Sequence, residues 1–230
     1  MRDFIVKMLL KVGLYKQSVD FINRLKFIVQ AKRMRRNGLE MLHAAENVLQ
    51  EHEVCAFLTF GTLLGAYREH GFISYDPDVD LGVVATTSPD DINRWMSQAG
   101  FVLCKQNILA GSDTVIEQTY LYKKLHLDIF FYFKEGQDFY SISQRPHETK
   151  EWKEANATDG FPCVRCYVPQ CEFELVDFLG VDVFVPKNAD GWLRAMYSDS
   201  YMTPIKDWNE KDYKTRIVHT QERSYRKYFS

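Results

Sequence analysis

Two aspartates stand two residues apart in the segment DVDLGVV, residues 78–84, and they are the first candidates for chemistry. On a β-strand, side chains alternate between faces, so Asp78 and Asp80 share one face while the apolar residues between them enter the core. Neighbouring carboxylates repel each other unless a cation neutralises them, and hard oxygen ligands suit Mg²⁺ or Mn²⁺. Such ions usually take phosphate oxygens as further ligands. The pair therefore predicts phosphoryl-transfer chemistry.

A glycine-led helix start precedes the aspartates. The apolar run Val54–Phe60 predicts a strand, and a helix is expected to begin at Gly61 and Thr62, with its free N–H groups facing an anion. These two residues would bind a phosphate oxygen, and Arg68, farther along the helix, would neutralise charge from the same side. The alternative for Arg68 is an ion pair with a neighbouring acid, namely Glu69, Asp76 or Asp78.

A third acid, Asp128, lies in LHLDIFF, residues 125–131, which we interpret as a strand. Alternation puts the leucines and Ile129 on one face and Asp128 on the other, beside aromatic neighbours. A lone carboxylate in such surroundings is costly unless a cation compensates its charge. A surface salt bridge is the alternative for a single aspartate.

The region around these acids resembles the LicD/fukutin family of phosphotransferases, which have the nucleotidyltransferase fold. The resemblance rests on GTLLG at 61–65, Arg68, GFI at 71–73, DPDVD at 76–80 with the LGV that follows, and a weaker block, WL at 192–193 and MYSDSYMTP at 196–204. It extends from about residue 38 to residue 204. Pro77 departs from the pattern, because family members commonly carry another acid there.

The resemblance implies an α+β fold, a mixed sheet flanked by helices. It places Asp78, Asp80 and Asp128 as the catalytic acids that hold Mg²⁺ or Mn²⁺, two ions about 4 Å apart. Four further residues would bind the substrate phosphate: Gly61, Thr62, Arg68 and Asp76. The implied reaction moves phosphocholine, ribitol phosphate or glycerol phosphate from a CDP-linked alcohol to a sugar hydroxyl and releases CMP. The acceptor would be a cell-surface glycan or glycolipid, such as lipopolysaccharide, capsule or teichoic acid.

Two other functions are weighed against this one. A true nucleotidyltransferase of the same fold would attack the α-phosphate of an NTP and release pyrophosphate, so the identity of the leaving group separates the two reactions. A non-catalytic scaffold at a membrane surface would need the basic N-terminus but not the acids. The presence of all three acids argues against the scaffold.

Charge is distributed unevenly along the chain of 230 residues. Residues 1–36 contain ten Lys or Arg and two Asp, a net charge of +8; because the whole chain carries −2, the remainder carries −10. We therefore divide the chain into a basic segment at 1–36, a catalytic domain at 37–205 and a C-terminal tail at 206–230. A hydrophobic content of 46% is enough for one substantial core.

Apolar residues in the basic segment recur at helical spacing, beginning with Phe4, Ile5, Met8, Leu9 and Val12. This pattern indicates a helix on an anionic membrane surface or, alternatively, a helix packed on the domain or on a second subunit. No recognisable nucleic-acid module accompanies the charge, so we expect no nucleic-acid partner. No uncharged apolar run reaches the roughly 20 residues of a membrane span.

Several elements follow from local patterns. Helices are expected at 37–51, with Asn37 as a possible N-cap, at 88–100, where Ser88 and Pro89 form a start signal, and at 188–197. Strands are expected at 101–105, 115–123, 125–133, 139–142 and 181–185. The prolines and glycines of residues 145–180 favour a loop-rich insertion.

The five cysteines are an odd number, and Lys7 and Lys11 interrupt any signal-peptide core. We therefore expect a cytoplasmic protein, either free or peripheral on the inner face of the membrane. Cys163, Cys166 and Cys171 have zinc-like spacing but supply three of the four ligands that a structural zinc site takes. Structural zinc is therefore possible, and we predict its absence.

Overall fold

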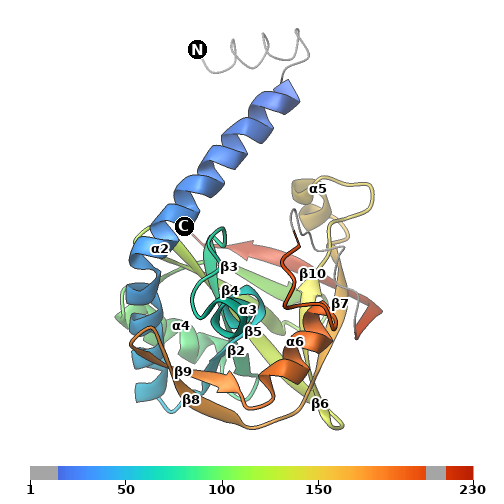
Figure 1. The fold of residues 1–230 in the computed structure, drawn as a ribbon. Helices are drawn as coiled ribbons and strands as arrows, with labels where there is room; N and C mark the ends of the chain where they lie inside the picture. The colour runs from blue at the N-terminus through green and yellow to red at the C-terminus, as the bar shows by residue number, and fades with distance from the viewer. Residues whose placement is uncertain (1–14, 206–215, 230) are drawn as a thin grey trace.

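The computed structural model describes residues 15–205 and 216–229, without the side chains of residues 15–27 and 31 (Figure 1). Its large mixed sheet with flanking helices confirms the predicted α+β class. In chain order the elements are α2 (Tyr15–Glu51), β1 (Ala56–Leu58), α3 (Phe60–Glu69), β2 (Asp78–Val84), α4 (Pro89–Gln98), β3 (Val102–Leu109), β4 (Val115–Tyr122), β5 (Leu125–Glu135), β6 (Asp138–Gln144), α5 (Trp152–Ala157), β7 (Phe161–Pro169), β8 (Phe173–Phe178), β9 (Val181–Pro186), α6 (Ala189–Tyr197) and β10 (Ile217–Tyr228).

The ten described strands follow the order β4-β3-β10-β7-β6-β5-β2-β1-β9-β8, and β4 also pairs with β5. Six strands, β5, β4, β3, β10, β7 and β6, therefore close into a ring. One edge of β5 pairs with β4 over its first half and with β6 over its second, while the other edge pairs in parallel with β2. Strand β5 thus joins the ring to the open sheet formed by β2, β1, β9 and β8.

The expected alternation is present in β2 and β5. Val79, Leu81 and Val83 are fully buried, and so are the leucines and Ile129 of β5. The core continues between the sheet and α6, where Phe57 stacks on Phe173 with ring centroids 4.1 Å apart and meets Trp192 edge-on. The apolar faces of β2 and β5 therefore fix which side chains turn toward the opposite face.

Helix α2 runs without interruption past Asn37, so the predicted helix start at that residue is wrong. No proline stands between residues 15 and 51, and the Arg and Lys residues before Asn37 are good helix formers. Met34, Leu42 and Leu49 are buried against the domain, whereas the N-terminal half of α2 extends away from it (Figure 1). The first 14 residues of the predicted basic segment lie outside the described residues. No helix among the described residues is both long and apolar enough to span a bilayer.

The loop-rich insertion expected at residues 145–180 is also wrong, because this stretch contains α5, β7 and β8. The burial alternation of β7 shifts by one residue between Cys163 and Val164, both of which are buried, so no continuous alternation identifies the strand. Pro162 is accommodated because it pairs with Arg223 next to an irregularity in β10, and prolines tolerate such positions. The C-terminal residues 217–228 form β10, which lies between β3 and β7 in the ring.

Candidate active site

The three predicted acids are brought together by the parallel pairing of β2 with β5. Asp80 lies directly opposite Asp128 in the register, and Asp78 is two residues away on the same face of β2. Asp76 stands in the turn that leads into β2. All four carboxylates line one cavity of about 440 Å³, which α3, β2 and the strands of the ring enclose.

The start of α3 is attached to β2 by three hydrogen bonds to Asp80. Thr59 N donates to Asp80 O (3.2 Å), Asp80 N donates to Thr62 Oγ1 (2.9 Å), and Gly61 N donates to Asp80 Oδ2 (3.2 Å). The N–H at the helix start thus binds a carboxylate of the protein itself, an arrangement that the helix dipole favours. Thr62 is 2% exposed and lies behind the cavity wall, so the structure gives it a positioning contact with β2. Phosphate binding by Gly61 and Thr62 stays a prediction.

Gly61 is closely packed against an acid of the site. A Cβ at this position would lie 2.3 Å from Asp76 Oδ2 and 3.6 Å from Asp80 Oδ2. The preceding residue, Phe60, has a φ of 42°, a left-handed conformation that is unusual for an aromatic residue. This sharp turn between β1 and α3 brings the helix start against the carboxylates.

Burial and mutual repulsion disfavour ionisation of these acids. Burial is the largest cause of the rise in the pKa of Asp78 to about 8, and the charge of Asp76 adds to it. Burial, then Glu117 and Asp78, raise the pKa of Asp128 to about 8. The pKa of Asp80 lies well above its ordinary value because the residue is buried beside Asp78, Asp76 and Asp128. Carboxylates in this state require a cation if they are to be charged together.

The donor set fits the chemistry of Mg²⁺ or Mn²⁺. Asp128 Oδ1 is buried and has no hydrogen-bond partner, so one oxygen of the central acid is available as a ligand. Within the described ranges, no group of three or more His, Cys, Asp or Glu side chains is arranged so that it could hold a metal ion as the side chains stand. Asp78, Asp80 and Asp128 share one face of two adjacent strands and supply oxygen ligands alone, which is the set that hard divalent ions take.

Arg68 forms the ion pair that was its alternative interpretation, and its binding to a phosphate stays a prediction. Its Nη2 lies 2.8 Å from Glu69 Oε1, so the predicted alternative ion pair forms, and its Nη1 donates to Tyr201 O (3.3 Å). The side chain is 8% exposed and also lines the cavity, where its Nε has no partner. Arg68 therefore offers a donor on the α3 side of the cavity.

Sequence reasoning missed the wall that the ring contributes. Lys105 and Asn107 of β3, Glu117 of β4 and Arg226 of β10 line the cavity opposite α3. Lys105 Nζ pairs with Glu117 Oε1 at 2.7 Å. Polar residues at alternate positions of apolar strands were an available signal for β3 and β4. Nothing in the sequence placed β10 beside them.

The cysteine array has no common face. Cys163 and Cys166 are three residues apart on β7, so their side chains point to opposite sides. Cys163 Sγ donates to Ser224 Oγ at 3.1 Å, and Cys166 Sγ lies 4.0 Å from Ser143 Oγ. The absence of structural zinc stays a prediction, which elemental analysis of the purified protein tests.

Comparison with known proteins adds independent information. A sequence model of the LicD/FKTN/FKRP nucleotidyltransferase domain matches residues 53–188, more than half of the chain and the whole segment from β1 to β9. The chain is 27% identical over 200 residues to ribitol-5-phosphate transferase FKTN of Mus musculus, covering 86% of this chain and 40% of the relative. The protein of the same name from Homo sapiens is 26% identical over 184 residues, 80% of this chain and 37% of the relative. The chain thus spans about two fifths of the length of these relatives.

Proposed function

This chain belongs to the LicD/FKTN/FKRP family, and from that premise we propose that it transfers ribitol phosphate, or a closely related phospho-alcohol, from a CDP-linked donor to a sugar hydroxyl of a glycan. Family membership supports the reaction class, and the names of the fukutin relatives favour ribitol phosphate as the transferred group. Divalent metal ions, a CDP-linked donor and CMP as the leaving group are parts of the proposal.

The observation that carries the proposal is the meeting of Asp78, Asp80 and Asp128 at one cavity, with Asp128 Oδ1 unpartnered. These acids would hold two divalent ions, whose chemistry is to neutralise the donor's phosphates and to lower the pKa of the acceptor hydroxyl. Buried acids with a raised pKa lower the stability of the folded protein unless a ligand binds them. Such a cost is typical of a functional site.

The protein's own residues supply positioning and charge. Asp80 and β2 are held in place because Gly61 N donates to the Asp80 carboxylate and Thr62 Oγ1 accepts from Asp80 N. Arg68 on one wall and Lys105 and Arg226 on the other place cations around an anionic donor. In the reaction, the acceptor oxygen bonds to the phosphorus that carries the alcohol. The bond from that phosphorus to the oxygen of the α-phosphate breaks, CMP leaves, and the hydroxyl proton is released.

Product analysis tests this function. The full chain is incubated with Mg²⁺, a panel of CDP-ribitol, CDP-glycerol and CDP-choline, and candidate glycans, and the products are identified by mass spectrometry. We expect CMP together with an acceptor heavier by one phospho-alcohol. Pyrophosphate and a nucleotide-bearing acceptor formed from CTP would instead identify a nucleotidyltransferase. Absence of product with every donor would contradict the proposal.

The proposal includes a position for the enzyme at the cytoplasmic face of an anionic membrane. Residues 1–36 carry a net charge of +8, and within the described part of that segment Ile28 and Val29 are 47% and 46% exposed. An exposed apolar pair among basic residues is typical of an interfacial helix. A glycan or glycolipid acceptor assembled at the membrane would then lie within reach.

A further inference from the structure

Among the residues that the structure describes, three buried side-chain atoms of the cavity wall have no hydrogen-bond partner: Arg68 Nε, Asn107 Oδ1 and Asp128 Oδ1. Arg68 and Asp128 already have places in the proposed reaction. Asn107 has none, although it is only 2% exposed and a buried unpaired amide oxygen is costly. A ligand that donates a hydrogen bond to this oxygen would remove that cost.

The orientation of the Asn107 amide is fixed by its neighbour. Asn107 Nδ2 donates to Glu117 Oε2 at 2.6 Å. The other carboxylate oxygen, Oε1, accepts from Lys105 Nζ (2.7 Å) and from Thr119 Oγ1 (3.3 Å). A carboxylate paired with a lysine only accepts hydrogen bonds, so the amide cannot exchange its nitrogen and oxygen without placing two acceptors together. Asn107, a residue of the cavity wall, therefore keeps its amide oxygen as a fixed acceptor without a partner.

A fixed donor stands beside this acceptor. Arg226 of β10 lies directly opposite Asn107 of β3 in the strand register and lines the same cavity. Its Nε donates to Gln144 Oε1 at 2.8 Å, and its guanidinium lies 4.5 Å from the centre of the Phe161 ring. The ring wall thus presents an acceptor and a donor with fixed positions.

We propose that Asn107 recognises the base of the donor nucleotide and selects cytosine over uracil. The 4-amino group of cytosine donates to Asn107 Oδ1, and Arg226 donates to the acceptors on the neighbouring ring edge. Uracil carries a carbonyl oxygen at position 4, which would face Asn107 Oδ1 as a second acceptor. A hydroxyl of the transferred alcohol can rotate to donate or accept, so a locked amide would discriminate little there. This inference rests on the proposed CDP-linked donor.

The test measures nucleotide binding without requiring transfer. Isothermal titration of the full chain with CMP and with UMP, in Mg²⁺, gives the ratio of the two dissociation constants. Wild-type protein should prefer CMP by at least about tenfold, because a site built around a hydrogen bond rejects a ligand that leaves it unpaired. Asn107→Ala should lose most of the preference by weakening CMP binding. Asn107→Ser, whose hydroxyl donates or accepts, should bind both nucleotides similarly.

Two further variants sharpen the test. Glu117→Gln permits the Asn107 amide to turn, so UMP binding should improve relative to CMP. Asn93→Ala removes another buried unpartnered Oδ1, in α4 and outside the cavity lining, and should leave the ratio unchanged. Thermal melts establish that each variant is folded.

The inference is overturned if folded Asn107→Ala and Asn107→Ser keep the wild-type ratio, or if wild-type protein shows no preference. A change in preference among CDP-alcohols without a change in the CMP to UMP ratio overturns it too. Loss of the CMP preference in Asn107→Ala supports it even if no transfer product is found. Transfer from CDP-ribitol with an unchanged ratio supports the proposed function and rejects this inference.

Discussion

At the scale of single residues, the acids of the cavity are held where their own charge is unfavourable. The pKa values of Asp78 and Asp128 are raised to about 8, in each case chiefly by burial, with neighbouring acids as the next cause. Without a bound cation, each of these buried acids lowers the stability of the folded protein. Two predictions follow for individual side chains.

The first concerns stability without metal. The pKa of Asp128 is near 8 in the folded protein, whereas its ordinary value is 3.8. Below about pH 4 the side chain is protonated in both the folded and the unfolded chain, so it does not lower the free energy of unfolding there. As pH rises from about 4 to about 8, the unfolded chain releases a proton that the folded chain keeps, so the free energy of unfolding falls across this range and levels off above it. Asp128→Asn should therefore melt a few degrees higher than wild type at pH 8 in a chelator, but not at pH 4.

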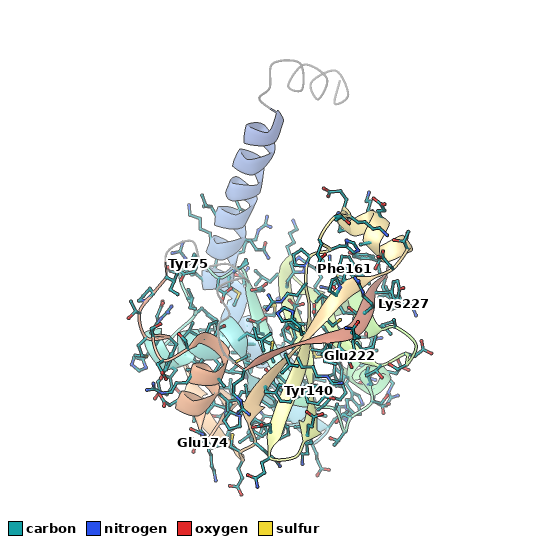
Figure 2. All side chains as sticks on the ribbon, turned by 90° about the vertical axis from the view of Figure 1, so that its right-hand side faces the viewer. Tyr75, Tyr140, Phe161, Glu174, Glu222 and Lys227 are labelled. Atoms are coloured by element: carbon teal, nitrogen blue, oxygen red, sulfur yellow. The ribbon has the colours of Figure 1, made fainter. Side chains whose placement is uncertain are left out.

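Thermal melts across this pH range, with and without Mg²⁺, measure the effect. Added Mg²⁺ should raise the melting temperature of wild type more than that of Asp128→Asn. Glu174→Gln, at the end of the molecule away from Tyr75 in Figure 2, is the control and should follow wild type. An Asp128→Asn protein less stable than wild type at pH 8 without metal would refute the argument.

Gly61 packs closely against the Asp76 side chain. Its added Cβ would meet the end of the Asp76 side chain at 2.3 Å, and a flexible side chain can turn away at little cost in stability. Gly61→Ala should therefore fold normally while displacing the Asp76 carboxylate, with a loss of activity of about tenfold. Gly71→Ala is a matched control, because its Cβ would have no neighbour closer than 3.8 Å. Equal rates for the two variants would remove Asp76 from the site.

The sequence alone was sufficient to predict the three acids of the site, but not the cavity wall that strands β3, β4 and β10 form. Strand alternation places Asp78 and Asp80 on one face, and the family resemblance adds Asp128 from a distant strand. Arg226 reaches Asn107 through a pairing between β10 and β3, more than a hundred residues apart in the chain. No local pattern records such a contact.

At the scale of elements, the position of β2 depends on close packing behind it. A Cβ at Gly82 would lie 2.2 Å from the Phe57 ring and 2.9 Å from the Tyr132 ring, and both side chains are fully buried. Strand β2 thus approaches the core closely enough to align Asp80 with Asp128. Packing on one face of the strand positions the acids on the other.

Gly82→Ala should therefore destabilise the protein by about 1–3 kcal/mol, because rigid buried rings cannot make room without shifting the strand. Chemical denaturation measures the loss, and activity should fall with it as the acids move. A free energy of unfolding equal to that of wild type would show that the core accommodates the methyl group.

Elements with strong end signals were predicted well, and those without were not. Helix α4 begins as expected, with Ser88 Oγ accepting from Asp90 N at 3.3 Å and Pro89 as the first helical residue. Strand β7 was missed because its alternation shifts by one residue between the buried Cys163 and Val164. The start of α2 was misplaced because Asn37 is a weak signal inside a run of helix-forming residues.

At the scale of the whole molecule, the cavity lies where the ring meets the open sheet, and one helix extends away from both (Figure 1). That helix, α2, buries Met34, Leu42 and Leu49 against the domain. It leaves four basic side chains exposed: Lys32, Arg33, Arg35 and Arg36. The exposed basic side chains suit contact with an anionic surface.

Liposome sedimentation tests this contact with the full chain. Binding should require acidic lipids and weaken as salt rises, because the Debye length is only about 8 Å at physiological ionic strength. Charge reversal at Lys32, Arg33 and Arg36 should reduce binding and leave activity on a small soluble acceptor unchanged. Failure to bind anionic liposomes at low salt would instead assign α2 to a protein partner.

The central claim is that Asp78, Asp80 and Asp128 hold divalent metal for transfer of a phospho-alcohol. Its most direct test is the initial rate of CMP release from CDP-ribitol, with an acceptor glycan, as Mg²⁺ is varied, for wild type, Asp80→Asn, Asp128→Asn and Glu174→Gln. We predict that wild type and Glu174→Gln require Mg²⁺, and that both aspartate variants, although folded, lose at least about a hundredfold in rate. Full activity in a chelator, or near-wild-type turnover by Asp128→Asn, would contradict the claim.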